Sequence, residues 1–107
     1  EDGARALNEY LQTLDCNKHI IISMMANKEH EKYISYFKDI SSITTIDLKT
    51  QPNSISGKDL KEKFKSIASV KYQPSIEQAI KSIDLEEGDL LLITGSLYGA
   101  AEVLSKN

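Results

Sequence analysis

Four short runs of apolar and β-branched residues recur along this chain, and segments with helical spacing separate them. The runs predict strands near residues 19–24, 42–48, 69–72 and 89–94. The first and last runs are apolar at nearly every position, which is typical of strands buried on both faces. Alternation of such strands with helices predicts an α/β domain with a mostly parallel sheet and helices on both faces.

Five segments have the three- and four-residue spacing of amphipathic helices. The first spans residues 3–15, and Asn27 is the expected N-cap of the second. Ser75 and Gln78 form a capping box at the start of the fourth, and the last is expected to begin beside Ser96. The apolar residues on which this spacing rests are Ala4, Leu7, Leu11, Leu14, Tyr33, Ile34, Phe37, Leu60, Phe64, Ile67, Ile76, Ala79, Ile80, Ile83, Leu97, Ala100, Ala101 and Leu104.

The length of 107 residues suffices for one domain with one hydrophobic core. Hydrophobic residues make up 40% and charged residues 27%, a composition typical of globular proteins. We therefore expect residues 1–107 to form a single domain. Because the predicted order begins with a helix, whereas a parallel crossover normally follows a strand, we also expect a further strand upstream of Glu1.

The charge and hydropathy of the chain argue against some classes of binding partner and indicate a location. The net charge is −3 and basic residues are scattered among acidic ones, which argues against binding to nucleic acid or to an anionic membrane. The apolar runs are far shorter than the roughly 20 residues that span a bilayer. Cys16 is the single cysteine and Glu1-Asp2 does not open a signal peptide, so we expect a reducing, cytoplasmic location.

The sequence lacks the motifs of several common kinds of catalytic and cofactor site. The chain has no Gly-rich phosphate loop followed by Lys and Ser/Thr, and no dinucleotide-binding fingerprint. His19 and His30 have no Cys or carboxylate partners at metal-ligand spacing, so we expect no metal site. Cys16 lacks a basic cluster that would activate a thiolate. We expect no catalytic residue within these 107 positions.

Three loops should lie at the carboxyl edge of a parallel sheet, where such folds bind ligands: 24–29, 50–57 and 94–98. In the last, Gly95 allows close approach of the backbone, and Ser96 offers a hydroxyl beside free helical N–H groups, which suits a phosphate or carboxylate. Lys28, which lies in the first loop, could reach an anion at the second loop. The alternative is that Gly95 is a turn residue, Ser96 an N-cap and Lys28 a solvated surface charge.

Three motifs, in order, resemble folylpolyglutamate synthase/dihydrofolate synthase of the Mur ligase superfamily. Gly3-Ala4-Arg5-Ala6-Leu7 is similar to the helix that follows the family's Asp-Gly-Ala-His-Asn motif. Residues 23–30, Ser-Met-Met-Ala-Asn-Lys-Glu-His, are similar to its Gly-Met-Met-Ala-Asp-Lys-Asp segment. Thr94-Gly95-Ser96-Leu97-Tyr98 matches its Thr-Gly-Ser-Leu-Tyr signature. The resemblance covers essentially the whole chain.

The resemblance implies a Rossmann-like, three-layer C-terminal domain of an ATP-dependent ligase. Such an enzyme adds L-glutamate to dihydropteroate or folate through an acyl phosphate. ATP and Mg²⁺ would bind mainly to an N-terminal ATP-binding domain of the same polypeptide, absent from these residues, and the fragment alone would be inactive. This domain would line the glutamate side of the cleft, through Gly95, Ser96, Tyr98 and Lys28.

Two other functions remain open from the sequence. A Mur-type peptidoglycan amino-acid ligase has a C-terminal domain of the same architecture, although the Thr-Gly-Ser-Leu-Tyr segment favours the folate enzymes. The second alternative is a non-enzymatic flavodoxin-like or receiver-like binding module. A receiver would need clustered acidic residues after its first strand, and Ser23-Met24-Met25 provides none.

Overall fold

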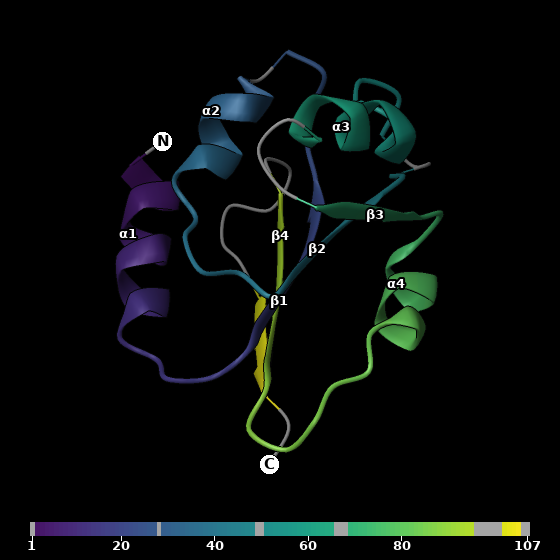
Figure 1. Cartoon of the computed structure of the whole chain (residues 1–107). Coiled ribbons are helices and arrows are strands. Elements are labelled where there is room, and N and C mark those ends of the chain that lie inside the picture. Colours follow the sequence, from purple (N-terminus) through teal and green to yellow (C-terminus); the bar gives the residue numbers. More distant parts are fainter. Residues whose placement is uncertain (1, 28, 49–50, 66–68, 96–101, 106–107) are drawn as a thin grey trace.

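The computed structural model describes residues 2–27, 29–48, 51–65, 69–95 and 102–105 (Figure 1). Helices and strands alternate along most of the chain, as the sequence predicts. The elements are α1 (Asp2–Gln12), β1 (Lys18–Ser23), α2 (His30–Ser35), β2 (Ser42–Ile46), α3 (Gly57–Phe64), β3 (Val70–Gln73), α4 (Ile76–Ser82), β4 (Leu90–Gly95) and β5 (Glu102–Ser105).

The strands form one sheet in the order β3-β2-β1-β4-β5. Strands β1 to β4 are parallel, and β5 runs antiparallel to β4. The register places Ile20 of β1 between Ile43 of β2 and Leu92 of β4. A mostly parallel sheet with this order is the doubly wound, Rossmann-like arrangement, so the predicted fold class is confirmed.

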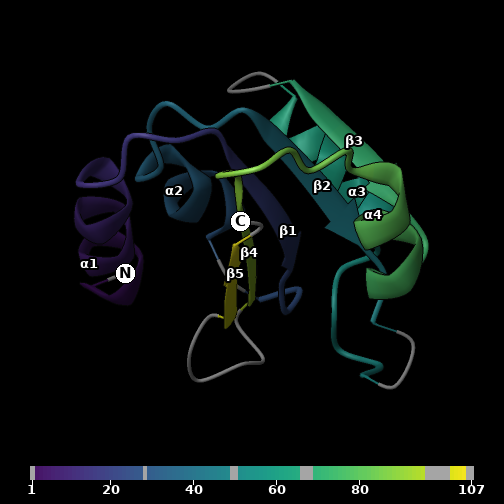
Figure 2. The same cartoon turned by 90° about the horizontal axis from the view of Figure 1, so that it is seen from below.

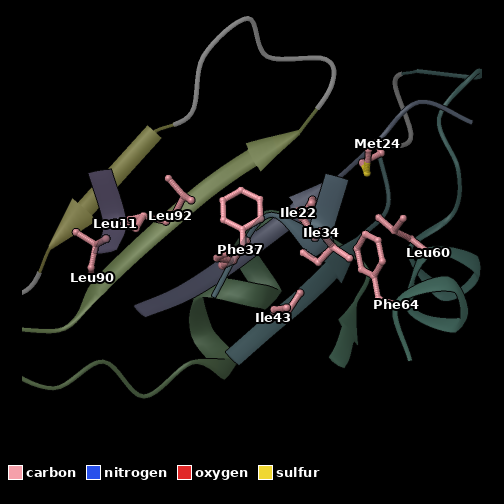
Figure 3. Packing of buried hydrophobic residues seen from close by; sticks show 11 residues of the cluster. Leu11, Ile22, Met24, Ile34, Phe37, Ile43, Leu60, Phe64, Leu90 and Leu92 are labelled. Carbon is pink, nitrogen blue, oxygen red and sulfur yellow. The ribbon is translucent and has the colours of Figure 1, made fainter. Parts of the chain in front are cut away.

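The helices cover both faces of the sheet because the central strands are apolar on both sides. Figure 2 shows α1 and α2 on one side of β1 and β4, and α4 on the other. On the α4 face, Ala79 packs with Ile21, Ile46, Leu91 and Ile93. On the opposite face, side chains from α1, α2 and α3 cover β1, β2 and β4, and Figure 3 shows most of this cluster. Leu11, Ile34, Leu60 and Phe64 lie on these helices, Phe37 follows α2, and together they pack over Ile20, Ile22, Ile43, Leu90 and Leu92.

Serine side chains fix the starts of two helices. The Ser56 hydroxyl accepts a hydrogen bond from the Asp59 amide at 3.1 Å, which caps α3. The Ser75 hydroxyl accepts one from the Gln78 amide at 3.1 Å, as the capping-box pattern predicts. Each bond satisfies one of the free N–H groups of a first helical turn. No described helix is long and apolar enough to cross a membrane.

Two details of the sequence prediction are wrong. Residues 102–105, expected in a last helix, form strand β5 against the free edge of β4. Pairing satisfies backbone groups of an edge strand, and so short an apolar run does not distinguish strand from helix by its spacing. Asn27 does not cap α2, which begins at His30 after Glu29, because residues 24–26 are held instead against the second loop. The other residues expected in the last helix, 97 to 101, lie outside the described residues.

Candidate functional site

The strand order places a topological switch point between β1 and β4. The chain leaves β1 toward α2 on one face, whereas α4, on the other face, leads into β4. In doubly wound sheets, ligands bind beyond the carboxyl ends of the strands at such a switch point. Ser23 and Gly95, the last residues of β1 and β4, are register partners. The segments that follow these two strands therefore start side by side.

Of the four site residues predicted from the sequence, the structure describes Gly95 alone, as the last residue of β4 at this switch point. Ser96, Tyr98 and Lys28 lie outside the described residues. Ser96 follows Gly95 directly, and Lys28 is five positions beyond the end of β1. The two central strands therefore describe only where the segments that carry these residues begin.

The first two carboxyl-edge loops are joined by backbone hydrogen bonds. The Ile55 amide donates to the Met24 carbonyl at 3.0 Å, and the Ala26 amide donates to the Asn53 carbonyl at 2.8 Å. An isolated antiparallel bridge pairs Met25 with Ser54 between these bonds. The two loops thus behave as a short two-stranded ribbon, which restrains the backbone just before Lys28.

Helix α2 connects this ribbon to the end of β4. The Nε2 atom of His30, buried in the first turn of α2, lies 2.9 Å from the Met25 carbonyl. A carbonyl only accepts, so Nε2 carries the proton in this contact. One turn later, the Tyr33 hydroxyl lies 2.9 Å from Oγ1 of Thr94, the residue before Gly95. Burial raises the pKa of Tyr33 above its ordinary value, which keeps the phenol protonated at neutral pH.

An acidic side chain at the end of β2 serves a structural contact. Asp47 accepts a hydrogen bond from the Gly57 amide at 2.7 Å through Oδ1 and from the Tyr72 hydroxyl at 2.5 Å through Oδ2. The bond to Asp47 is the largest cause of the raised pKa of Tyr72. Each carboxylate oxygen of Asp47 thus accepts a hydrogen bond that joins β2 to α3 or to β3. We therefore assign Asp47 a structural role.

Ser23 is the polar residue most directly at the switch point. Its side chain is fully buried, and its Oγ has no hydrogen-bond partner among the described residues. An unpaired buried hydroxyl is costly, so a partner from the neighbouring segments or from a ligand would stabilise it. Within the described parts of the chain, no group of three His, Cys, Asp or Glu side chains could hold a metal ion.

Residues 1–97 match the family of the Mur ligase glutamate ligase domain. The chain belongs to this family. Its fold is similar to that of bifunctional folylpolyglutamate synthase/dihydrofolate synthase from Yersinia pestis, solved with AMPPNP and a Mn ion: the TM-score is 0.73, with 20% identity over 87% of this chain and 23% of that one. A structure of an enzyme of this name with Mn, AMPPNP and L-glutamate bound gives a TM-score of 0.69, with 19% identity over 86% and 22% of the two chains. No match was found among curated proteins.

The Mur ligase family assignment confirms the resemblance inferred from the three motifs, and the solved relatives confirm the fold. This glutamate ligase domain spans less than a quarter of the length of those relatives. The matched range ends at residue 97, within the Thr-Gly-Ser-Leu-Tyr segment. The family match thus includes both segments that leave the switch point, the one after β1 and the start of the one after β4.

Sequence reasoning did not single out every residue that shapes this edge. Tyr33 was expected to face inward, but nothing in its spacing indicates that its hydroxyl reaches Thr94, 61 residues away. His30 was considered as a metal ligand and quoted within the segment 23–30, but neither indicates its contact with the Met25 carbonyl. Ser23 lies in a quoted motif, but its burial depends on the strands on either side. Contacts of this kind arise from the tertiary fold and leave no local pattern.

Proposed function

We propose that this chain is the C-terminal glutamate-ligase domain of a longer ATP-dependent enzyme that joins L-glutamate to dihydropteroate or folate. The observation that carries the proposal is the match of residues 1–97 to the Mur ligase glutamate ligase domain family. The fold likeness to a folylpolyglutamate synthase/dihydrofolate synthase solved with Mn, AMPPNP and L-glutamate supports the folate branch. The Thr94-Gly95-Ser96-Leu97-Tyr98 segment supports the same branch.

The proposed reaction has two steps. The γ-phosphoryl group of ATP moves to a carboxylate of the pteroate or folate substrate, giving an acyl phosphate and ADP. The amino group of glutamate then attacks the acyl carbon, an amide bond forms, and inorganic phosphate leaves with the loss of a proton from nitrogen. Phosphoryl transfer needs a phosphate cradle and Mg²⁺, and an N-terminal ATP-binding domain of the same polypeptide would supply both.

The part proposed for this domain is to bind and orient glutamate across the cleft from that ATP-binding domain. A fixed orientation lowers the entropic cost of bringing two substrates together. The proposed glutamate-side residues are Gly95, Ser96, Tyr98 and Lys28. The pairing of Ser23 with Gly95 supports grouping them, because the segments carrying Lys28 and Ser96 begin at the ends of adjacent parallel strands. A lysine charge and a hydroxyl suit the carboxylates of glutamate.

The experiment is an assay of the full-length polypeptide with ATP, Mg²⁺, labelled L-glutamate and either dihydropteroate or tetrahydrofolate. We expect ADP release that depends on both glutamate and the pterin substrate, with label entering the pterin product. Turnover only with a UDP-muramoyl acceptor would assign the chain to the peptidoglycan ligases instead. Absence of turnover with every acceptor, in a folded protein that binds ATP, would contradict the ligase proposal.

The glutamate site has its own test in the same polypeptide. Ser96→Ala removes a donor on the substrate side, so the KM for glutamate should rise about 3- to 10-fold, the equivalent of one hydrogen bond. The KM for ATP should change less than twofold, because ATP binds to the other domain. Glutamate kinetics equal to those of the wild type would leave Ser96 with the alternative role of an N-cap.

A further inference from the structure

A partly enclosed cavity of about 270 Å³ lies at the edge of the sheet where the strands begin. Ser69, directly before β3, and Ile43, the second residue of β2, both line it. Because strands β1 to β4 are parallel, this edge is opposite the one at which β1 and β4 end in Ser23 and Gly95. The cavity therefore lies away from the switch point.

The floor of this cavity is apolar. It consists of side chains from α2, the loop after it and β2: Ile34, Phe37, Ile40 and Ile43. Ile34, Phe37 and Ile43, which Figure 3 labels, are buried core residues, and Ile40 is partly buried against the same core. A cavity of about 150 Å³ is enough to hold benzene. The present one thus has room for one aromatic ring with a short substituent.

The mouth of the cavity is polar, because Asp39, Ser41 and Ser69 line it and are exposed. Asp39 is the one charged residue of the described lining, and its carboxylate has no ion-pair partner within the described parts of the chain. Oγ of Ser41 accepts a hydrogen bond from the Lys18 amide at 3.3 Å and keeps a second lone pair. These groups can accept hydrogen bonds from a cation above the apolar floor.

The loop that carries Asp39 is held on both sides. The Lys38 amide donates to Oδ1 of Asn8 at 3.1 Å, and Nε2 of Gln12 donates to the Lys38 carbonyl at 2.9 Å. The Ser41 amide donates to the carbonyl of the first residue of β1 at 2.8 Å. Between these bonds Asp39 has a φ of 54°, in the left-handed region that few residues other than glycine adopt. The fold therefore presents this carboxylate on a restrained backbone.

We propose that this cavity binds a small amphipathic amine, with its aromatic or branched aliphatic group on the apolar floor and its ammonium group at Asp39. Sites for small ligands combine an apolar lining with a few polar groups that fix the orientation of the ligand. None of the described lining residues is cationic, so an anionic ligand would meet only the repulsion of Asp39. The site is independent of the proposed ligase function, since it lies at the other edge of the sheet.

Benzylamine is the ligand for the test, because it has one ring and an ammonium group at neutral pH. The full-length polypeptide, labelled with ¹³C at the isoleucine δ1 methyl groups, is titrated with benzylamine and followed by methyl NMR. We expect saturable shifts at Ile34, Ile40 and Ile43, with a dissociation constant on the order of millimolar for so small a ligand. The methyl groups of Ile21 and Ile93, on the α4 face, are internal controls and should not move.

Benzyl alcohol and Asp39→Asn separate the charge from the apolar contact. Benzyl alcohol has the same ring without the charge, and asparagine removes the charge of Asp39 while tolerating the left-handed backbone. Asp39→Asn should weaken benzylamine binding about two- to fivefold, the range of an exposed ion pair, and leave benzyl alcohol unchanged. In the wild type, benzyl alcohol should bind more weakly than benzylamine by the same factor. Asp84→Asn, at an exposed carboxylate outside the cavity lining, is the matched control and should change neither affinity.

Three outcomes would overturn the proposal. Absence of saturable shifts at Ile34, Ile40 and Ile43 would show that the cavity does not bind the amine. Equal affinity of the wild type for benzylamine and benzyl alcohol would show that no cation is recognised, and this comparison needs no variant. An equal loss of affinity for both ligands in Asp39→Asn would show that the substitution alters the cavity and not one ion pair. The ligase assay described above is unaffected by any of these results.

Discussion

Gly57 lies against the ring of Tyr72, so closely that a side chain at position 57 would place its Cβ 2.5 Å from Cε1 of the tyrosine. The same atom would lie 2.8 Å from the backbone carbonyl carbon of Ile46. The ring cannot easily move aside, because Asp47 holds the Tyr72 hydroxyl at 2.5 Å while also accepting from the Gly57 amide. Absence of a side chain at Gly57 thus allows α3 to begin directly against β2 and β3.

Gly57→Ala should destabilise the domain, although alanine is the better helix former. Contacts this short force side-chain and backbone shifts that cost about 1–3 kcal/mol. Urea denaturation followed by circular dichroism measures the change. Lys63→Ala, at an exposed position of the same helix, is the control and should change the free energy of unfolding by less than about 0.5 kcal/mol. Equal stability of Gly57→Ala and the wild type would contradict the close packing.

Two adjacent threonines of β2 should respond oppositely to the same substitution. Oγ1 of Thr44 is buried without a hydrogen-bond partner among the described residues, whereas Oγ1 of Thr45 donates to the Gly57 carbonyl at 2.6 Å. Valine keeps the shape and removes the hydroxyl. Thr44→Val should be neutral or stabilising by up to about 1 kcal/mol, and Thr45→Val should destabilise by about 1–2 kcal/mol. Unfolding midpoints of the pair test this, and a large loss at Thr44 would reveal a partner for its hydroxyl.

The domain should lose stability in acid partly through Asp89. Its pKa lies below the ordinary value because its carboxylate accepts a hydrogen bond from the Glu86 amide at 2.9 Å and, as lesser causes, from His19 and Asn17. A folded-state pKa below the unfolded one stabilises the fold at pH values above the unfolded pKa of about 4. That contribution is lost as the pH falls through the folded-state pKa.

Asp89→Asn should therefore flatten the acid side of the stability profile. Asparagine keeps an oxygen that can accept from the Glu86 amide but has no charge to titrate. Urea midpoints measured between pH 2.5 and 6 should fall less steeply for the variant than for the wild type. Asp84→Asn, at an exposed carboxylate close in sequence, is the control and should follow the wild-type profile. Parallel curves for the wild type and Asp89→Asn would show that the pKa is not depressed.

The polypeptide of residues 1–107 should neither hydrolyse ATP nor ligate glutamate on its own. Phosphoryl transfer requires a phosphate-binding loop and bound Mg²⁺, and the sequence contains no such loop. The assay combines the purified fragment with ATP, Mg²⁺, glutamate and a folate acceptor, and circular dichroism establishes that the fragment is folded. Turnover above a protein-free control, persisting in material purified to remove contaminating ligase, would place the active site within this domain.

The sequence by itself determined the four parallel strands, because runs of apolar and β-branched residues recur between helical segments. The runs of β1, β2 and β4 are continuous enough to be buried on both faces. It determined the cap of α4, since Ser75 and Gln78 interact across one helical turn. Because parallel strands have their carboxyl ends at one edge of the sheet, the alternation of strands and helices also places three loops at that edge. These features depend on neighbouring residues, so local spacing is sufficient to predict them.

Only the tertiary structure decided how that edge is held together. Whether residues 102–105 form a helix or a strand depends on the free edge of β4, which no local pattern reveals. The start of α2 depends on the bridge between Met25 and Ser54, nearly thirty positions apart. The contact of Tyr33 with Thr94 depends on where the fold places α2 relative to the end of β4. Such contacts join residues distant in sequence, so their geometry follows from packing of the whole sheet and its helices.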